Sequence, residues 1–337
     1  MASPTYLAVD VMGGDESPHS FICASVSFLK LNPLVHITLF GDKVIVESSL
    51  NALDTSAVIS RLNLIHAEQF VTPEEKPGTA LRSKQSSSMW LALRAVANGE
   101  AQAVLSAGNT GALMAMARYL VGTLEGIERP AICKRMPVSG SPCFVLDLGA
   151  NIKVGAKQLH EFSLMGAALA EVEGVAPVKV GLLNVGAELQ KGTEVLQAAD
   201  KLLRDDSRFE YVGFVEGNAI FEGIANVVVC DGFTGNVALK ASEGLARYLI
   251  RDLRRYFAAS LWRKILGALL GVMAIGWFKR LDPSAYNGAL LVGLKGVVVK
   301  SHGAADDKSF QAALRVTCDQ AQRRPDKLLA SWLSQSL

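Results

Sequence analysis

A short apolar run, a glycine-rich turn and a helix-like stretch follow one another several times along this chain. The apolar runs that lead into such turns cover residues 7–12, 103–106, 144–148, 178–183 and 227–230. None of them alternates apolar and polar residues, which indicates strands buried on both faces. Strands of this kind, separated by helices, form a largely parallel sheet with helices packed on both sides. We therefore predict an α/β fold with a doubly wound, mostly parallel sheet.

The composition is typical of a globular protein. The chain has 337 residues, of which 50% are hydrophobic and 20% charged, and no low-complexity linker divides it. We expect a single α/β catalytic domain over residues 1–337. The net charge of +2 does not favour a nucleic-acid partner. Five cysteines without a CxxC pair favour the cytoplasm over a disulfide framework or a metal site, and the first residues do not resemble a signal peptide.

Residues 261–281 form the most apolar part of the chain. Residues 265–278 carry no charge, and basic residues flank them on both sides. A membrane-spanning helix needs about 20 apolar residues, so this run is too short to cross a bilayer. It is either a buried or dimer-interface helix, or a segment that lies in the membrane interface. Trp262 and Trp277 are residue types that favour the membrane interface.

The segment before this apolar run predicts an amphipathic helix. Leucines recur every four residues on one face, and a second face carries Arg247, Arg251, Arg254 and Arg255. An arginine-rich helix that leads into a short apolar segment suits an anionic membrane surface. We therefore expect residues 239–285 to form an amphipathic and apolar helical projection for membrane or dimer contact. The alternative is an ordinary core or dimer-interface helix with solvated arginines.

The glycine-rich turns suggest an anion site. Turns between strand and helix direct backbone N–H groups and the positive helix end toward one point. In open α/β sheets such turns meet at the carboxyl edge of the strands, where ligands bind. The candidate phosphate and oxyanion ligands are Gly13, Gly14, Asn109, Thr110, Gly111, Asn151, Thr234, Gly235 and Asn236. The alternative is that these residues only form turns and helix caps.

Three further polar residues are candidates for catalysis. His302 follows the apolar run at 296–299, where a last strand would deliver it to the ligand crevice. Asp10 and Asp231 stand at strand ends, where they would orient donors or cap helices. The sequence contains no dinucleotide fingerprint, Walker lysine motif or G-x-S-x-G elbow. We therefore predict no cofactor and no catalytic serine nucleophile.

Taken together, the turns carry a family resemblance. The chain resembles the bacterial phosphate acyltransferases of the PlsX type, also called acyl-ACP:phosphate transacylases. The matching segments run in order along nearly the whole chain and are LAVDVMGGD at 7–15, SAGNTGALM at 106–114, LEGIERPA at 124–131, LDLGAN at 146–151, GLLNVG at 181–186, VVVCDGFTGNVALK at 227–240 and YNGALLVGLKGVVVKSHGAAD at 286–306. Lys153 and the pair Asn218-Ala219 depart from the family pattern.

The resemblance implies a function and a set of partners. It implies a homodimeric α/β/α sandwich, like phosphotransacetylases and isopropylmalate-type dehydrogenases. The substrates would be long-chain acyl-ACP and inorganic phosphate. The acyl phosphate product would pass to a membrane glycerol-3-phosphate acyltransferase for phospholipid synthesis. The enzyme would be cytoplasmic and peripherally associated with the inner face of the cell membrane.

On this hypothesis the turn residues bind phosphate and the oxyanion, and His302 donates a hydrogen bond or a proton at the reacting centre. Asp10 and Asp231 orient donors. The arginine face then receives either the acidic carrier protein or the membrane. Two other functions compete with this one. A nicotinamide-dependent decarboxylating dehydrogenase would share the architecture, and a non-enzymatic membrane-surface scaffold would explain residues 261–281 but not the row of polar turns.

Overall fold

The structure is a computed structural model that describes residues 3–138, 140–263 and 283–334. One sheet runs through it. Its strand order, within the described residues, is β3-β2-β1-β4-β11-β10-β5-β6-β9-β7-β8. The strands are β1 (Thr5–Asp10), β2 (Val35–Gly41), β3 (Leu62–His66), β4 (Ala103–Ser106), β5 (Ala131–Met136), β6 (Cys143–Leu146), β7 (Lys179–Leu183), β8 (Glu210–Val215), β9 (Val227–Val229), β10 (Ala289–Val292) and β11 (Val297–Lys300).

Helices cover both faces of this sheet. They are α1 (Pro18–Leu31), α2 (Lys43–Asn51), α3 (Pro77–Ser83), α4 (Ser88–Ala97), α5 (Thr110–Leu120), α6 (Ala156–Val172), α7 (Glu194–Arg204), α8 (Ala219–Glu222), α9 (Gly232–Ala258), α12 (Asp307–Arg323) and α13 (Pro325–Ser334), with short 3₁₀ turns at Ile59–Arg61, Leu189–Lys191 and Pro283–Tyr286. One apolar core joins one strand face to α1, α2, α6, α7, α12 and α13. A second core joins the other face to α3, α4, α5, α8 and α9. The doubly wound α/β prediction is therefore confirmed.

The sheet changes direction at its centre. Seven of the ten strand pairs among the described residues are parallel, but β10 is antiparallel to both β11 and β5, and β5 is antiparallel to β6. The strands β1 to β4 and β11 therefore run opposite to β6 to β9. We expected all polar turns at one carboxyl edge. That expectation is wrong, because the reversal sends the turns of the two halves to opposite edges.

All five predicted apolar runs are strands, although β1 starts at Thr5 rather than at residue 7. The polar stretch at 71–88 contains α3, a short helix that begins with Pro77 at its first position and buries Ala80. Proline is favoured at the first helical position because its missing N–H has no acceptor there, so a proline in a polar stretch can start a helix as well as a loop.

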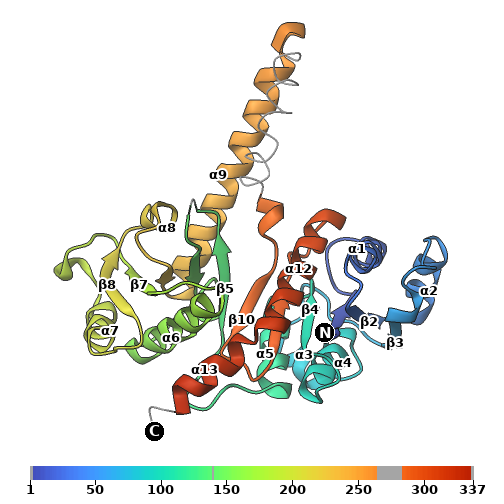
Figure 1. Cartoon of the computed structure of the whole chain (residues 1–337), viewed down its shortest axis with the longest axis horizontal. Helices are drawn as coiled ribbons and strands as arrows, with labels where there is room; N and C mark the ends of the chain where they lie inside the picture. Colours follow the sequence, from blue (N-terminus) through green and yellow to red (C-terminus); the bar gives the residue numbers. More distant parts are fainter. Residues whose placement is uncertain (1–2, 139, 264–282, 335–337) are drawn as a thin grey trace.

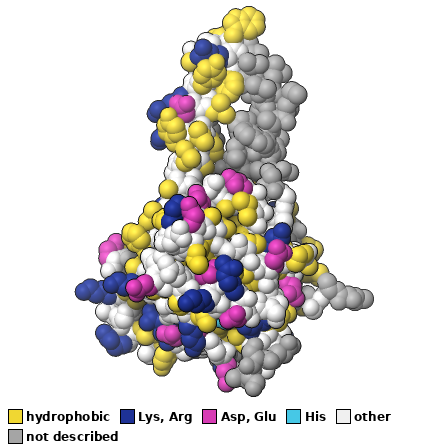
Figure 2. All heavy atoms as spheres, turned by 90° about the vertical axis from the view of Figure 1, so that its left-hand side faces the viewer, with side chains coloured by type: hydrophobic (Ala, Val, Ile, Leu, Met, Phe, Trp, Pro, Cys, Tyr) yellow, Lys and Arg dark blue, Asp and Glu magenta, His cyan; other side chains and the backbone are white. Residues whose placement is uncertain are grey.

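The predicted amphipathic helix is α9, which rises away from the sheet (Figure 1). Arg247, Arg251 and Arg255 are exposed on it, and Figure 2 shows basic and hydrophobic side chains along the projecting part. The apolar residues 264–282, with Trp277, lie outside the described residues, as does the Arg254 side chain. Within the described part of the chain, no helix is both long and apolar enough to cross a bilayer.

Candidate active site

A cavity of about 270 Å³ lies on the second face of the sheet, between the N-terminal ends of α5 and α9. Strands β5, β10 and β11 form its floor. Three of the predicted site residues, Thr110, Asn236 and His302, line it together. The other lining residues are Ile132, Lys134, Leu148, Gly149, Leu239, Lys240, Asn287, Gly288, Ala289, Lys300 and Ser301. The turns that follow β4 and β9 therefore reach one cavity over the face of the sheet through Thr110 and Asn236, although they leave opposite edges.

Lys300 places a half-buried cation in this cavity. It ends β11, where it pairs with Ser106 of β4 and with Ala289 of β10. Its Nζ donates to the carbonyl of Ala107 at 3.1 Å and to that of Ser301. Burial lowers the pKa of Lys300 to about 8, although Asp15 and Asp10 favour its charged form. The ammonium group thus remains charged at neutral pH, and no carboxylate of the described residues forms an ion pair with it, which suits an anionic ligand.

Asn287 holds the turn that carries His302. Its Oδ1 accepts from the backbone N–H of His302 at 3.0 Å, and its Nδ2 donates to Ser301 Oγ at 2.8 Å and to the Ser309 carbonyl at 3.0 Å. Asn287 is buried, so these bonds are protected from water. The His302 side chain is 43% exposed and can reach a ligand at the cavity rim.

A buried ion pair forms one wall. Lys134 Nζ and Glu243 Oε1 are 2.8 Å apart, and each side chain is only 6% exposed. His302 Nε2 lies 3.5 Å from the same carboxylate, and Lys240 Nζ lies 3.2 Å from it. Burial raises the pKa of Glu243, but His302, Lys134 and Lys240 outweigh it and hold this pKa well below its ordinary range. Glu243 therefore connects β5, α9 and the His302 turn as a carboxylate.

Asp10 supports the turn after β4 from behind the cavity. Its Oδ2 accepts from Ser106 Oγ at 2.6 Å, and Ser106 Oγ accepts from the Gly108 N–H at 3.1 Å. Burial raises the pKa of Asp10 to about 6, against the hydrogen bonds from Ser106, Ser88 and Met12 and the charge of Lys300. Asp10 thus orients the turn rather than lining the cavity.

The N-terminus of α5 is a neutral helix end. Asn109 is its N-cap, with Oδ1 accepting from Ala112 N at 3.0 Å, while its Nδ2 donates to the carbonyls of Thr72, Pro73 and Glu75. The Asn109 side chain is therefore engaged in holding the turn. The first backbone N–H groups of α5, from Thr110 and Gly111, have no acceptor within the helix and can bind an anion.

The N-terminus of α9 is capped by a carboxylate instead. Asp231 accepts from Thr234 N at 2.9 Å and from Thr234 Oγ1 at 2.6 Å. Asp231 thus orients Thr234, and its charge offsets the positive end of the helix. Gly235 lets α9 approach the turn after β6, since a Cβ there would lie 2.0 Å from the Asp147 carbonyl oxygen. An incoming anion therefore encounters a more favourable field at α5 than at α9.

The remaining predicted ligands lie in supporting turns. Asn151 is buried and donates to the Pro130 carbonyl and to Asp147. Gly13 and Gly14 lie in the turn after β1, which donates to the Gly303 carbonyl through Asp15 N at 3.0 Å. Neither these three residues nor Asn109, Gly111, Thr234 and Gly235 are among the residues that line the cavity. Their roles as ligands stay predictions.

The charged residues of the site were not predicted from the sequence. Lys134, Lys240, Glu243 and Lys300 were not among the candidates, nor was Asn287. Two of them carried a usable signal. Lys134 interrupts an apolar strand and Lys300 ends one, and a lysine in a buried strand needs a specific partner or a ligand. Glu243 gave no such signal, because a glutamate is ordinary in an amphipathic helix.

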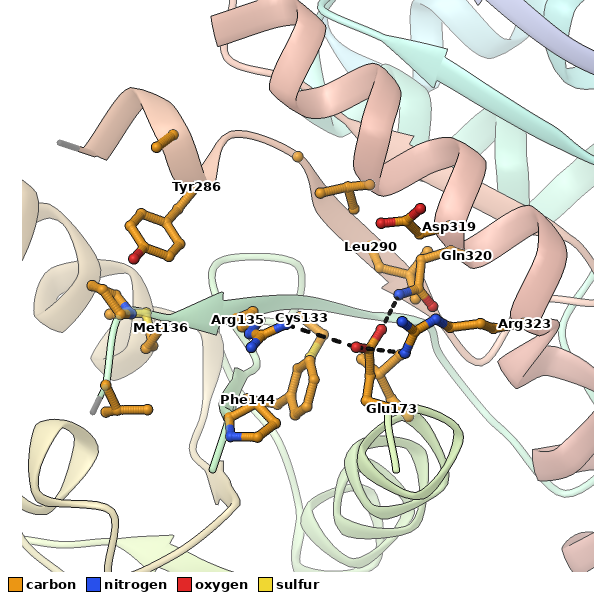
Figure 3. A pocket seen from close by; sticks show the side chains of 17 residues that line it. Cys133, Arg135, Met136, Phe144, Glu173, Tyr286, Leu290, Asp319, Gln320 and Arg323 are labelled. Carbon is orange, nitrogen blue, oxygen red and sulfur yellow. Dashed lines mark hydrogen bonds and ion pairs between the residues drawn. The ribbon is translucent and has the colours of Figure 1, made fainter. Parts of the chain in front are cut away.

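A second cavity of about 290 Å³ lies behind β5 and β10, on the opposite face (Figure 3). Its arginines already face a carboxylate. Glu173 lies 2.6 Å from Arg323 and 3.8 Å from Arg135, and it accepts from Gln320 Nε2 at 2.7 Å. Asp319 adds a further carboxyl group to the lining, and burial raises its pKa. This cavity is therefore a poorer anion site than the one that contains Lys300.

Comparison with known proteins gives consistent matches over nearly the whole chain. A family model described as "Fatty acid synthesis protein" matches residues 5–327. The phosphate acyltransferase of Saccharophagus degradans is 46% identical over 332 residues, 98% of this chain and 96% of that protein. The phosphate acyltransferase of Cellvibrio japonicus is 47% identical over 331 residues, 98% of each chain.

Solved structures with the same fold are more distant in sequence. EutD phosphotransacetylase from Staphylococcus aureus superposes with a TM-score of 0.62 at 17% identity, covering 94% of each chain. A branched-chain phosphotransacylase from Enterococcus faecalis gives a TM-score of 0.58 at 14% identity, covering 94% of this chain and 99% of that one. At such identities the likeness establishes the shared fold alone.

Proposed function

The chain belongs to the phosphate acyltransferase family, and we propose that this enzyme moves a long-chain fatty acyl group from acyl-ACP to inorganic phosphate. The products are then acyl phosphate and free ACP. The observation that carries this proposal is the cavity in which the Lys300 ammonium, the N-terminus of α5 and His302 face one space. A phosphate dianion needs charge and directed N–H donors, and a thioester carbonyl needs room beside it.

Phosphate is the nucleophile in this mechanism. Lys300 and the first N–H groups of α5 hold the dianion next to the thioester. A phosphate oxygen attacks the carbonyl carbon, so a C–O bond forms and the carbonyl oxygen becomes an oxyanion. When this intermediate collapses, the C–S bond breaks and the carrier leaves as a thiolate, which takes up one proton. His302, oriented by Asn287 and Glu243, donates a hydrogen bond or that proton.

The experiment that tests the proposal is phosphate-dependent release of free ACP from palmitoyl-ACP, with acyl phosphate trapped by hydroxylamine. The His302→Ala variant should release ACP roughly 10- to 100-fold more slowly, since it loses one hydrogen bond to a charged oxygen. His66→Ala is the matched control, because His66 accepts from Lys43 N in a surface turn far along the sheet order. Release that does not depend on phosphate, or a His302→Ala variant with the wild-type rate, would contradict the assignment.

The fate of the product supports a place beside a membrane acyltransferase. An acyl phosphate is a reactive mixed anhydride, so an enzyme that consumes it must lie close by. We propose that a membrane glycerol-3-phosphate acyltransferase takes it, and that this protein acts as a homodimer in the cytoplasm, on the inner face of the cell membrane. Sedimentation of the purified protein, alone and with liposomes, tests the dimer and the membrane association separately.

The exposed side chains of α9 support an anionic partner. Arg247, Arg251 and Arg255 are exposed on one part of the helix, and Leu261 and Trp262 beyond it are 77% and 82% exposed. Reversing Arg247 and Arg251 to glutamate should abolish binding to liposomes rich in anionic lipid if the face contacts the membrane. The same variant should instead raise KM for acyl-ACP if the face receives the carrier. Wild-type liposome binding together with a wild-type KM for acyl-ACP would show that the arginine face contacts neither the membrane nor the carrier.

A further inference from the structure

A large apolar groove runs along α9 from the candidate active site. Its volume is about 780 Å³. Leu239, Leu245, Ala246, Leu249, Ile250, Leu253 and Tyr256 of α9 line it, with Met136, Pro137, Phe221 and Tyr286 on the other sides. The hydrophobic side chains over this part of α9 are visible in Figure 2. Among the described lining residues, the charged ones are Lys134, Glu243 and Asp252, and the first two form the ion pair at the active-site wall.

The groove adjoins the cavity that contains Lys300. Lys134 and Leu239 line both. On α9, Asn236 and Lys240 line the polar cavity, Leu239 lines both spaces, and further apolar lining follows from Leu245 to Tyr256. A molecule that enters both spaces therefore meets phosphate-binding groups at one end and hydrocarbon surface at the other. This order of polar head and apolar tail is that of a fatty acyl thioester.

We propose that the groove on α9 binds the hydrocarbon chain of the acyl donor and of the acyl phosphate product. This inference rests on the proposed function. The length fits, because the 17 helical steps from Leu239 to Tyr256 extend over about 26 Å of helix. Two opposed acyl chains make up a bilayer core of about 30 Å, so one chain needs roughly half of that. The groove is therefore long enough to hold the whole of a long acyl chain.

Two other occupants are less well matched to the groove. A second copy of the chain or the acyl tails of membrane lipids could cover the exposed leucines of α9. Neither would use the connection through Lys134 and Leu239 to the polar cavity. The acyl chain of the substrate does use it, since its carbonyl must reach the phosphate site while its tail leaves water. The chain length of the donor is therefore the quantity that separates these occupants.

The test compares kcat/KM for palmitoyl-ACP and butyryl-ACP at saturating phosphate in Ala246→Phe and the wild type. Ala246 is half-buried in the groove, so a phenyl ring there blocks the path of a long chain. Each methylene that loses its binding surface lowers affinity about fourfold. The palmitoyl-to-butyryl ratio should fall at least tenfold. Ala241→Phe is the matched control, because Ala241 is an exposed alanine of the same helix outside the groove, and its ratio should not change.

A second variant maps the direction of the groove. Leu253 lies seven residues further along α9, about 10 Å from Ala246 along the helix axis. Leu253→Trp should leave kcat/KM for donors of intermediate chain length unchanged and lower it only for the longest donors. This variant serves as the test if Ala246→Phe does not fold.

Several outcomes would overturn the groove as the acyl site. They are an unchanged ratio in Ala246→Phe, an equal fall with both donors, or an unchanged ratio accompanied by loss of the dimer or of liposome binding. If the wild type itself makes no acyl phosphate from either donor, the proposed function fails as well. If it uses both donors while the ratio does not respond to Ala246→Phe, only the groove assignment fails.

Discussion

Replacing Lys300 by methionine is expected to lower kcat/KM for phosphate by about 10²- to 10³-fold. Lys300 is half-buried in the cavity, and within residues 3–138, 140–263 and 283–334 its Nζ hydrogen-bonds to the carbonyls of Ala107 and Ser301 and pairs with no carboxylate. A phosphate dianion would supply the missing counter-charge, and truncating one partner of a buried charge pair costs about 2–5 kcal/mol. Methionine has nearly the same length and no charge. The loss should therefore appear in the dependence of the rate on phosphate concentration.

The pH profile gives this prediction a second readout. The pKa of Lys300 is lowered to about 8, so the wild-type kcat/KM for phosphate should fall as the pH rises above about 8. In Lys300→Arg the guanidinium stays charged, and this fall should move to higher pH. A profile that is flat above pH 8 in the wild type would exclude Lys300 as the phosphate anchor, and so would equal phosphate dependence in Lys300→Met.

The stability of the two proteins serves as the control. The unfolded chain holds the Lys300 proton more tightly than the folded one, because its pKa there is about 10.5 instead of about 8. The free energy of unfolding of the wild type should therefore rise with pH across this window, relative to Lys300→Met. Chemical denaturation at pH 7.5 and 10 measures this difference. A variant that is folded and no less stable at neutral pH, yet inactive, separates anion binding from structure.

The fold was predictable because its signals are local. Runs such as 103–106 and 227–230 are apolar throughout and end in glycine turns, and burial on both faces leaves few alternatives. The reversal at the centre of the sheet was not predictable in this way. Lys134 and Arg135 break the apolar pattern of β5, and β5 pairs with β10, a strand more than a hundred residues later in the chain.

The residues of the site also differ in how far they could be predicted from local sequence signals. Thr110, Asn236 and His302 belong to turns that can be recognised in the sequence by their glycine and small polar residues. The structure brings these three residues to one cavity. Turn composition cannot separate a ligand from a cap, as Asn109 and Asp231 demonstrate, since each uses its side chain to cap a helix. Which polar turn residue faces a cavity depends on the helix rotation that packing imposes, and a single sequence does not contain that information.

The ion pair between Lys134 and Glu243 shows how much of the site depends on contacts distant in sequence, because its members lie 109 residues apart. Lys134→Met leaves the buried Glu243 with Lys240 and His302, which are 54% and 43% exposed, as its remaining ion-pair partners in the described part of the chain. Removing one member of a buried pair costs about 3–5 kcal/mol, and we expect a loss near 3 kcal/mol in the free energy of unfolding. Urea denaturation at pH 7.5 measures it.

The double variant Lys134→Met, Glu243→Leu should recover most of this stability, because well-packed apolar side chains replace a buried ion pair at little cost. Its activity should stay low, since Lys134 lines the cavity and Glu243 faces His302. Lys179→Met provides the matched control. Lys179 lies 3.9 Å from Glu210 with side chains 45% and 51% exposed, so its loss should change stability by less than about 0.5 kcal/mol.

The pH dependence of the free energy of unfolding tests whether the Glu243 carboxylate causes the loss of stability in Lys134→Met. In the wild type the pKa of Glu243 lies below its ordinary value of 4.5, so Glu243 contributes stability above that pH and loses it in acid. In Lys134→Met the buried carboxylate lacks its main cation and takes up a proton more readily. The stability deficit of the single variant should therefore shrink as the pH falls toward 4.5. A deficit that is independent of pH, or a double variant as unstable as the single one, would mean that packing around Lys134, and not its charge, holds β5 against α9.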